Sequence, residues 1–243
     1  MKKTLLLCAT VIAISLSLTH TSQAEMTNSD VQKIVESFIM ENPETILKSV
    51  NDYQTKGVSE RQEQALTANK RKIYDDSFSP ITGNENGDVI VVEFFDYNCG
   101  YCKRAFESVD KLIQTDKGVK FVFKEFPILG PTSETAARWA LAAHNQGKYT
   151  EFHTQLMKSK GRINDQMLEN LATSLSLDVA KLKKDAQSDK ISKHISENRA
   201  LAQQLGVTGT PGFIIGDEVI PGAISYDDMV ALIAEQRAET AKN

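Results

Sequence analysis

A strand–helix–strand pattern in the middle of the chain does most to limit the folds that this sequence can adopt. Residues 89–95 form an almost continuous apolar run, interrupted only by Glu93, as in a strand that is buried on both faces. A helical pattern follows over residues 100–114, and a second apolar run covers residues 119–126. This order and spacing predict a βαβ unit, in which parallel strands are joined by a right-handed crossover.

Two cysteines, Cys99 and Cys102, stand between the first of these strands and the helix. If Cys99 opens the helix, its sulfur faces unpaired N–H groups and the positive end of the helix dipole, and both favour the thiolate over the thiol. Cys102 then lies one turn further along the same side, close enough for a disulfide but less exposed. This arrangement predicts Cys99 as the attacking sulfur and Cys102 as the resolving sulfur.

Other interpretations of the cysteine pair are weaker. A structural disulfide over this short separation closes almost no loop and gains little stability. A zinc site needs further ligands, and His144, His153 and His194 are scattered without ligand spacing. Two-coordinate Cu(I) remains a minor alternative because thiolates are soft ligands. A CxxC pair inside a βαβ unit therefore favours a redox-active dithiol without a metal.

Two further features support reactive chemistry. Glu93 interrupts an apolar strand, either because it faces water at an edge or bulge, or because it is a buried carboxylate that takes the proton of Cys102. We favour the second interpretation. The dipeptide Thr210-Pro211 precedes a predicted strand, where proline is often only a boundary. A cis bond there would instead expose backbone groups beside the dithiol, able to pair with an extended client segment.

The remainder of the main domain, predicted over residues 78–243, is mostly helical. Residues 132–205 contain no convincing strand, and a hairpin is predicted around Gly216-Asp217, followed by a helix over residues 226–237. Plausible helix N-caps within the helical region are Thr132, Asn164, Asp178 and Ser188. The sequence therefore predicts a long helical insertion of about residues 132–205 between two parts of one sheet.

The first 24 residues predict a secretory signal peptide. Two lysines precede an apolar stretch over residues 5–18, and a small-x-small site ends at Ala24, after which we expect cleavage. The stretch is short for a membrane span, and lipidation of Cys8 is a minor alternative. Cleavage would leave Cys99 and Cys102 as the only cysteines.

Residues 25–56 predict a helical segment that assembles the protein. Val31, Ile34 and Phe38 recur at helical spacing, Asn42-Pro43 ends the helix, and a second short helix follows. Because two short helices cannot build a core, their apolar faces must pack on the main domain or on copies of themselves. The polar segment 57–77 predicts a helical or partly ordered linker, with a surface helix of one continuous domain as the alternative.

The charge of the chain says less about its function. The sequence has 28 basic and 32 acidic residues, which gives a formal net charge of −4. This balance favours solubility and argues against nucleic acid as the main partner. After the predicted signal peptide, no segment is apolar enough to span a membrane.

Three parts of the chain together resemble a known family. The segments VVEFFDYNCGYC and VTGTPGFIIGDEVIPG, with the helical insertion between them, resemble the DsbA-like thioredoxin-fold proteins of the bacterial periplasm. The N-terminal extension is similar to that of the ScsC branch, the suppressors of copper sensitivity. The resemblance covers about residues 78–240 and implies an α/β thioredoxin fold with a long helical insertion, preceded by an α-helical N-terminal extension. It also implies a periplasmic location.

The resemblance assigns roles to individual residues. It implies Cys99 as nucleophile, Cys102 as resolving cysteine, Glu93 as buried acid, and Thr210 and Pro211 as the cis-proline loop. Gly100 and Tyr101, between the cysteines, are expected to line the client site with that loop. The most familiar oxidase of the family has Pro-His between its cysteines and Val before its cis-proline. Since one stabiliser of the thiolate is absent here, we expect a less strongly oxidising dithiol.

These implications lead to one main functional prediction. We expect a disulfide isomerase without a cofactor that acts on exported, cysteine-containing proteins, because Thr210 before the proline resembles the isomerases. We also expect a homotrimer or another homo-oligomer, kept reduced by a DsbD- or ScsB-like membrane reductase. The close alternative is a dithiol oxidase recharged by a DsbB-like partner. A copper-binding or chaperone-like protein is the alternative from another class.

Overall fold

The computed structural model describes residues 26–242. The predicted signal peptide, residues 1–24, lies outside these residues. The chain divides into two compact units, with the boundary between Gln54 and Thr55. Among the helices that the structure describes, none combines the length and apolarity that crossing a bilayer requires. Each unit is described by itself below.

The first unit contains α1 (Asn28–Glu41) and the beginning of α2 (Pro43–Tyr74). Thr27 caps α1 through a capping box with Asp30, and the helix ends at Asn42, where the sequence predicts its end. No residue of α1 is buried. An exposed apolar stripe runs along this unit and comprises Val31, Ile34, Val35, Phe38, Ile39, Ile46, Leu47 and Val50.

The segment predicted as a linker, residues 57–77, is largely helical. The second helix continues to Tyr74 and does not stop near residue 56, so the prediction of a short second helix is wrong, whereas the helical character of the segment agrees with its interpretation as helical. The prediction relied on the polar composition of this segment. Its few apolar side chains nevertheless include Leu66 and Ile73, which are two helical turns apart and both buried in the core of the second unit.

The second unit is built on a five-stranded sheet with the order β1-β3-β2-β4-β5. The central pair β2 and β3 is parallel, as the βαβ pattern predicts, whereas β1, β4 and β5 each run antiparallel to their neighbours. The hairpin around Gly216 is present, and Gly216 has a positive φ of 59°. The strands are β1 (Ile81–Gly83), β2 (Val89–Phe95), β3 (Val119–Glu125), β4 (Gly212–Ile215) and β5 (Glu218–Pro221).

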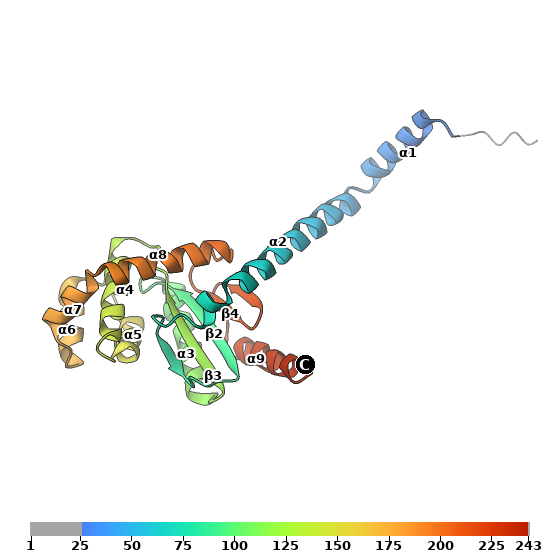
Figure 1. Cartoon of the computed structure of the whole chain (residues 1–243). Coiled ribbons are helices and arrows are strands. Elements are labelled where there is room, and N and C mark those ends of the chain that lie inside the picture. The colour runs from blue at the N-terminus through green and yellow to red at the C-terminus, as the bar shows by residue number, and fades with distance from the viewer. Residues whose placement is uncertain (1–25, 243) are drawn as a thin grey trace, which may run out of the picture. The chain divides into compact units, whose positions relative to one another are not determined.

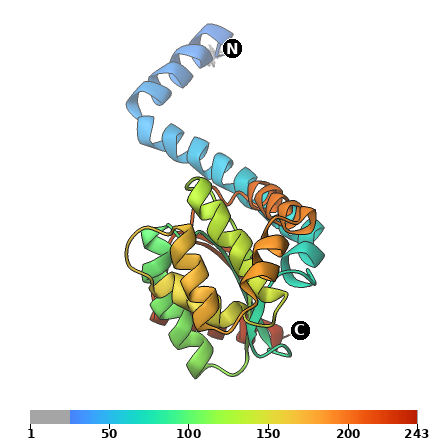
Figure 2. The same cartoon turned by 90° about the vertical axis from the view of Figure 1, so that its left-hand side faces the viewer.

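Helices cover both faces of this sheet (Figure 1). Alternate residues of β2 point to opposite faces. Val91 and Phe95 join the larger core cluster with α3 (Gly100–Thr115) and α9 (Tyr226–Thr240). Val92 and Phe94 join the smaller cluster, which includes residues of α2 and α8. Figure 2 shows the end of α2 beside α8, on the face opposite to α3.

The helical insertion comprises α4 (Pro131–His144), α5 (Tyr149–Lys158), α6 (Asp165–Ser174), α7 (Val179–Ala186) and α8 (Asp189–Gln204). Asn164, Asp178 and Ser188 cap α6, α7 and α8 with their side chains, as predicted. Thr132 is not a cap, because α4 already begins at Pro131, whose fixed φ suits the first helical position. The predicted α/β fold with a helical insertion and a helical N-terminal extension is confirmed.

A buried lysine ties the end of α2 to the sheet. Lys124 of β3 is fully buried, and its Nζ donates to the carbonyl of Lys72 at 2.6 Å and to Ser79 Oγ at 2.8 Å. Its Nζ also lies 3.1 Å from the carboxylate of Asp76. Because a buried ammonium group is costly without partners, these contacts fix the segment after α2 over β3.

The packing of Ile73 gives the first prediction. Ile73 of α2 is fully buried against the sheet. Ile73→Ala should therefore lower the free energy of unfolding by about 2–5 kcal/mol. Thr67→Ala, at an exposed position of the same helix, should change it by less than about 0.5 kcal/mol. Urea unfolding at equal protein concentrations measures both. Equal, small effects would contradict the packing of α2 on the sheet.

Candidate active site

Cys99 lies at the end of the short connection between β2 and α3. It is the N-cap residue of α3, with extended backbone, and its N–H donates to the carbonyl of Asp96 at 3.0 Å. Its own carbonyl accepts the N–H of Lys103 at 3.1 Å, which is the first hydrogen bond of the helix. No side chain caps this helix end. The sulfur of Cys99 is therefore the side-chain group at the positive end of the helix dipole, as predicted.

Both cysteines are free thiols in the structure. Cys102 is fully buried, whereas Cys99 has 6% of its surface exposed. The predicted order of exposure is thus correct, although Cys99 is more enclosed than the sequence suggests. Burial raises the pKa of the Cys102 thiol well above its ordinary value, and the nearby Glu93 carboxylate raises it further. Cys102 therefore needs a proton acceptor to form a thiolate.

The loop that carries Thr210 and Pro211 covers Cys99. The bond between these two residues is cis, and Cys99 Sγ lies 3.2 Å from the carbonyl oxygen of Thr210. The Pro211 carbonyl accepts the N–H of Gly222 at 2.9 Å, which joins the loop to the end of the hairpin. A groove of about 380 Å³ runs along this loop, and Gln62 of α2 forms part of its wall. The structure thus brings Thr210 and Pro211 to Cys99, the predicted nucleophile.

The two residues between the cysteines differ in exposure. Tyr101 is 62% exposed, and the guanidinium of Arg104 lies 4.1 Å from the centre of its ring. Gly100 is also exposed, and a Cβ at its position would meet only Arg104, at an ordinary contact distance. Local packing therefore does not require glycine here. Both positions are open to a client that approaches Cys99.

Glu93 lies in the centre of the sheet and beneath α3. It is opposite Phe123 of β3 and Phe213 of β4, and only 1% of its surface is exposed. The alternative of an edge or bulge position that faces water is therefore wrong. Its Oε1 has no hydrogen-bond partner, and burial raises its pKa to about 8, with a contribution from the charge of Cys99. A neutral carboxyl of this kind can exchange a proton with a thiol near neutral pH.

A cluster of buried polar side chains follows the strand that leads to the cysteines, and this cluster was not predicted from the sequence. Tyr97 donates to Glu125 Oε1 at 2.9 Å, and Tyr149 donates to the same oxygen at 2.8 Å. The Tyr97 hydroxyl also lies 3.0 Å from Nδ1 of His153. The signal that could have found it is Glu125 itself, because, like Glu93, it is a carboxylate within a predicted buried strand. Burial raises the pKa of Glu125 well above its ordinary value.

Two of the three predicted histidines lie near one another, because the rings of His144 and His194 both contact Phe78. His153 is buried among the rings of Phe95, Phe123 and Tyr149, and burial lowers its pKa to about 3. His194 is buried elsewhere, 3.5 Å from Asp76. Within residues 26–242, no group of three or more His, Cys, Asp or Glu side chains is placed to hold a metal ion.

Comparison with known proteins identifies the family. Residues 90–234 match the model of the DSBA-like thioredoxin domain. The chain belongs to this DsbA-like family. It is 41% identical to a thioredoxin-like oxidoreductase from Silicibacter pomeroyi, over 70% of this chain and 98% of that one, with a TM-score of 0.68. A linker-deletion mutant of ScsC from Proteus mirabilis is 27% identical, with a TM-score of 0.70, over 90% of this chain and 100% of that one.

Curated relatives extend the comparison. The DsbA-like chain is 27% identical over 172 residues to disulfide bond formation protein D of Bacillus subtilis, which covers 65% of this chain and 76% of that protein. It is also 26% identical over 162 residues to the Na⁺/H⁺ antiporter NhaA 1 of Salinispora arenicola. There the chain spans only 25% of the length of its relative.

The buried Glu93 gives the second prediction. A carboxyl of the unfolded chain ionises near pH 4.5, whereas Glu93 in the folded chain keeps its proton up to about pH 8. The stability of the reduced protein should therefore fall as the pH rises between these values. Glu93→Gln removes this titration, so the variant should gain on the order of 3–5 kcal/mol relative to the wild type between pH 4.5 and pH 8.

Urea unfolding across this pH range measures the difference. Glu107→Gln, at an exposed position of α3, serves as the matched control and should follow the wild type at every pH. A stability difference between Glu93→Gln and the wild type that does not change with pH would show that Glu93 does not titrate in this window.

Proposed function

We propose that this protein is a thiol-disulfide oxidoreductase that acts on cysteine-containing exported proteins through Cys99 and Cys102. The observation that carries the proposal is the position of Cys99 Sγ, at the N-terminus of α3 and 3.2 Å from the Thr210 carbonyl. A disulfide held against this loop would meet the sulfur that the helix dipole activates. Membership of the DsbA-like family and the similarity to an oxidoreductase of known structure support the same activity.

The proposed reaction begins with attack by the Cys99 thiolate on a client disulfide. A bond forms between Cys99 and one client sulfur, and the other client sulfur leaves as a thiolate. Glu93 in its ionised form then takes the proton of Cys102. The Cys102 thiolate attacks Cys99, which releases the reduced client and leaves the Cys99–Cys102 disulfide. If a client thiol attacks the mixed disulfide first, Cys99 leaves as a thiolate and the client disulfide has been isomerised.

Isomerase activity is our main proposal, and oxidase activity is the alternative. An isomerase must start from the reduced pair, so its dithiol should be only weakly oxidising. No histidine stands between Cys99 and Cys102, and Tyr101 projects into solvent. One stabiliser of the thiolate that the strong oxidases use is therefore absent. A membrane reductase of the DsbD or ScsB type would keep the pair reduced, whereas a DsbB-like partner would recharge an oxidase.

We place this activity in the bacterial periplasm. The predicted signal peptide over residues 1–24 supports export, and a periplasmic thioredoxin-like protein from Salmonella enterica is among the similar structures. An oxidising compartment also supplies clients whose disulfides need correction.

Refolding of scrambled ribonuclease tests the activity and gives the third prediction. The reduced wild-type protein should restore ribonuclease activity, and Cys99→Ala should abolish the rescue because no mixed disulfide can form. Cys102→Ala should retain part of the rescue, since a client thiol can still resolve the mixed disulfide. Activity only on reduced ribonuclease would favour the oxidase. Absence of any exchange, together with tight Cu(I) binding, would favour the copper-binding alternative.

We also propose that the first unit assembles the protein into a homotrimer or another homo-oligomer. Its exposed apolar stripe includes Phe38, Ile34 and Leu47, whose side chains are about half exposed or more. Copies of the same helix can cover such a stripe. The match to ScsC, which covers 90% of this chain, extends into this segment. Several dithiols around one client would raise their effective concentration.

Assembly through this stripe gives the fourth prediction. Phe38→Glu should place charge in the apolar interface and convert the oligomer into a monomer, as light scattering would show. Lys33→Glu changes an exposed side chain of the same helix that lies away from Phe38, and should leave the mass unchanged. The monomer should also lose isomerase activity while it keeps simple thiol exchange. A wild-type protein that is already monomeric would contradict the assembly role.

A further inference from the structure

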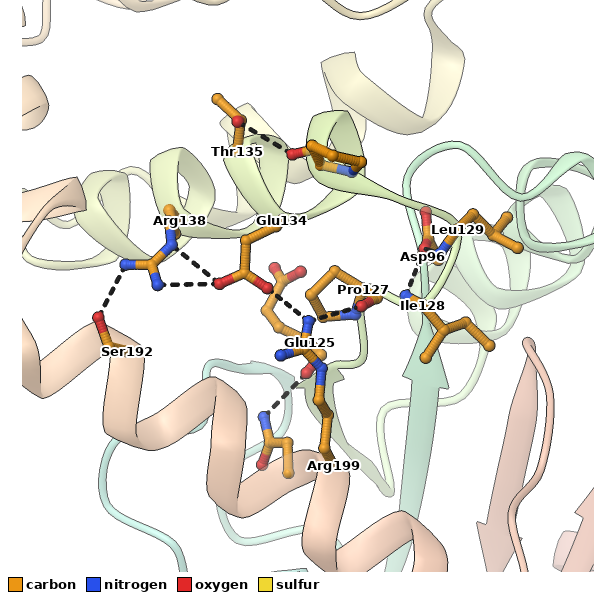
Figure 3. Close-up of polar contacts among 12 residues, drawn as sticks. Asp96, Glu125, Pro127, Ile128, Leu129, Glu134, Thr135, Arg138, Ser192 and Arg199 are labelled. Atoms are coloured by element: carbon orange, nitrogen blue, oxygen red, sulfur yellow. Dashed lines mark hydrogen bonds and ion pairs between the residues drawn. The ribbon is translucent and has the colours of Figure 1, made fainter.

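Three successive side chains attach the segment before Cys99 to the helical insertion. We call residues 96–98 the redox loop. Asp96 is the first of them, and its Oδ2 accepts the N–H groups of Ile128 at 2.8 Å and Leu129 at 2.9 Å (Figure 3). Both donors belong to the connection between β3 and α4. The buried carboxylate of Asp96 thus binds the start of the redox loop to the entry of the insertion.

Tyr97 makes the second attachment and is 1% exposed. Its hydroxyl proton is donated to Glu125 Oε1, at the end of β3. The same hydroxyl lies 3.0 Å from Nδ1 of His153 of α5, and when its proton goes to Glu125 the imidazole must be the donor in this contact, since a hydroxyl has one proton. A neutral imidazole protonated at Nδ1 meets this requirement, and its low pKa keeps it neutral. Water cannot replace these buried hydrogen bonds.

Asn98 makes the third attachment. Its Nδ2 donates to Thr132 Oγ1 and to Ser133 Oγ, each at 3.0 Å, in the first turn of α4. The N–H of Asn98 is itself bound by Asp96 Oδ1 at 2.8 Å. The redox loop is therefore fixed at every residue, immediately before the nucleophile.

The connection between β3 and α4, which binds the redox loop, is itself held in place by α8. Arg199 of α8 donates to the Pro127 carbonyl at 2.9 Å and pairs with Glu134 of α4 (Figure 3). Asn198 of α8 donates to the Glu125 carbonyl at 3.2 Å. The connection between β3 and α4 is thus fixed by α8 while it holds the redox loop, so the insertion offers a rigid support.

We propose that the helical insertion positions the nucleophile, and that Tyr97 is the central positioning residue. The redox loop determines where Cys99 stands, because the N–H of Cys99 binds the Asp96 carbonyl. Loss of the Tyr97 hydroxyl would loosen the loop and weaken the alignment of Cys99 Sγ with the end of α3. The consequence for redox chemistry rests on the proposed function, whereas the positioning of the thiol does not.

Two tyrosine variants, each of which removes one buried hydroxyl, test this role. Tyr97→Phe and Tyr149→Phe each remove one buried hydroxyl that donates to Glu125 Oε1, but only Tyr97 belongs to the redox loop. Two quantities are measured in the full-length protein. The first is the rate of Cys99 alkylation by iodoacetamide at pH 7, in a Cys102→Ser background. The second is the equilibrium constant of the Cys99–Cys102 disulfide with glutathione. Urea unfolding of both variants compares the loss of stability.

We expect Tyr97→Phe to slow alkylation by about two- to fivefold, the range that a helix dipole contributes to an anion at its N-terminus. The glutathione equilibrium should shift toward the disulfide by a similar factor, because the reduced form loses thiolate stabilisation. Tyr149→Phe should show neither change, although it also loses stability, and less than Tyr97→Phe, because its hydroxyl makes one of these hydrogen bonds and that of Tyr97 makes two. Equal changes in both variants, or none, would overturn the positioning role. A wild-type disulfide that does not exchange with glutathione, combined with slowed alkylation in Tyr97→Phe, would reject the proposed function alone.

Discussion

The burial of β2 on both faces is the constraint on which the site depends. This strand pairs with β3 on one side and β4 on the other, so its end is fixed at the centre of the sheet. Cys99 follows that end and begins α3, while β4 starts next to Pro211. The same pairing places Glu93 under the helix. One buried strand therefore positions Cys99, the loop that covers it and the Glu93 carboxyl beneath the helix.

Patterns that are local in the sequence predicted most of the fold. The βαβ unit, the hairpin and three of the helix caps each depend on residues close together in the chain. Strand β1 was not predicted, because it is only three residues long and exists through pairing with the distant β3. The continuity of α2 and the burial of its C-terminal part were also missed, since Leu66 and Ile73 find their apolar partners in the sheet and in α8.

The candidate site was also predicted only in part from the sequence. The spacing of Cys99 and Cys102, the apolar context of Glu93 and the dipeptide Thr210-Pro211 are visible in the sequence, and their placement could be anticipated. The anchors of the redox loop could not, because each contact joins residues about 30 or more positions apart, as between Asn98 and Thr132 or between Tyr97 and His153. Their polar side chains resemble those of any surface loop until the insertion covers them.

The burial of Cys102 and Glu93 suits the proposed isomerase more than a fast oxidase. In the proposed reaction, attack by Cys102 is one of two ways to end the mixed disulfide, and this step needs a thiolate in a place where burial disfavours charge. Glu93 can accept the proton only in its ionised form, which burial also disfavours. Both effects should slow attack by Cys102 and so lengthen the life of the mixed disulfide in the proposed reaction. A client thiol then has time to attack it, and that attack moves the client disulfide without consuming the reduced state of the protein.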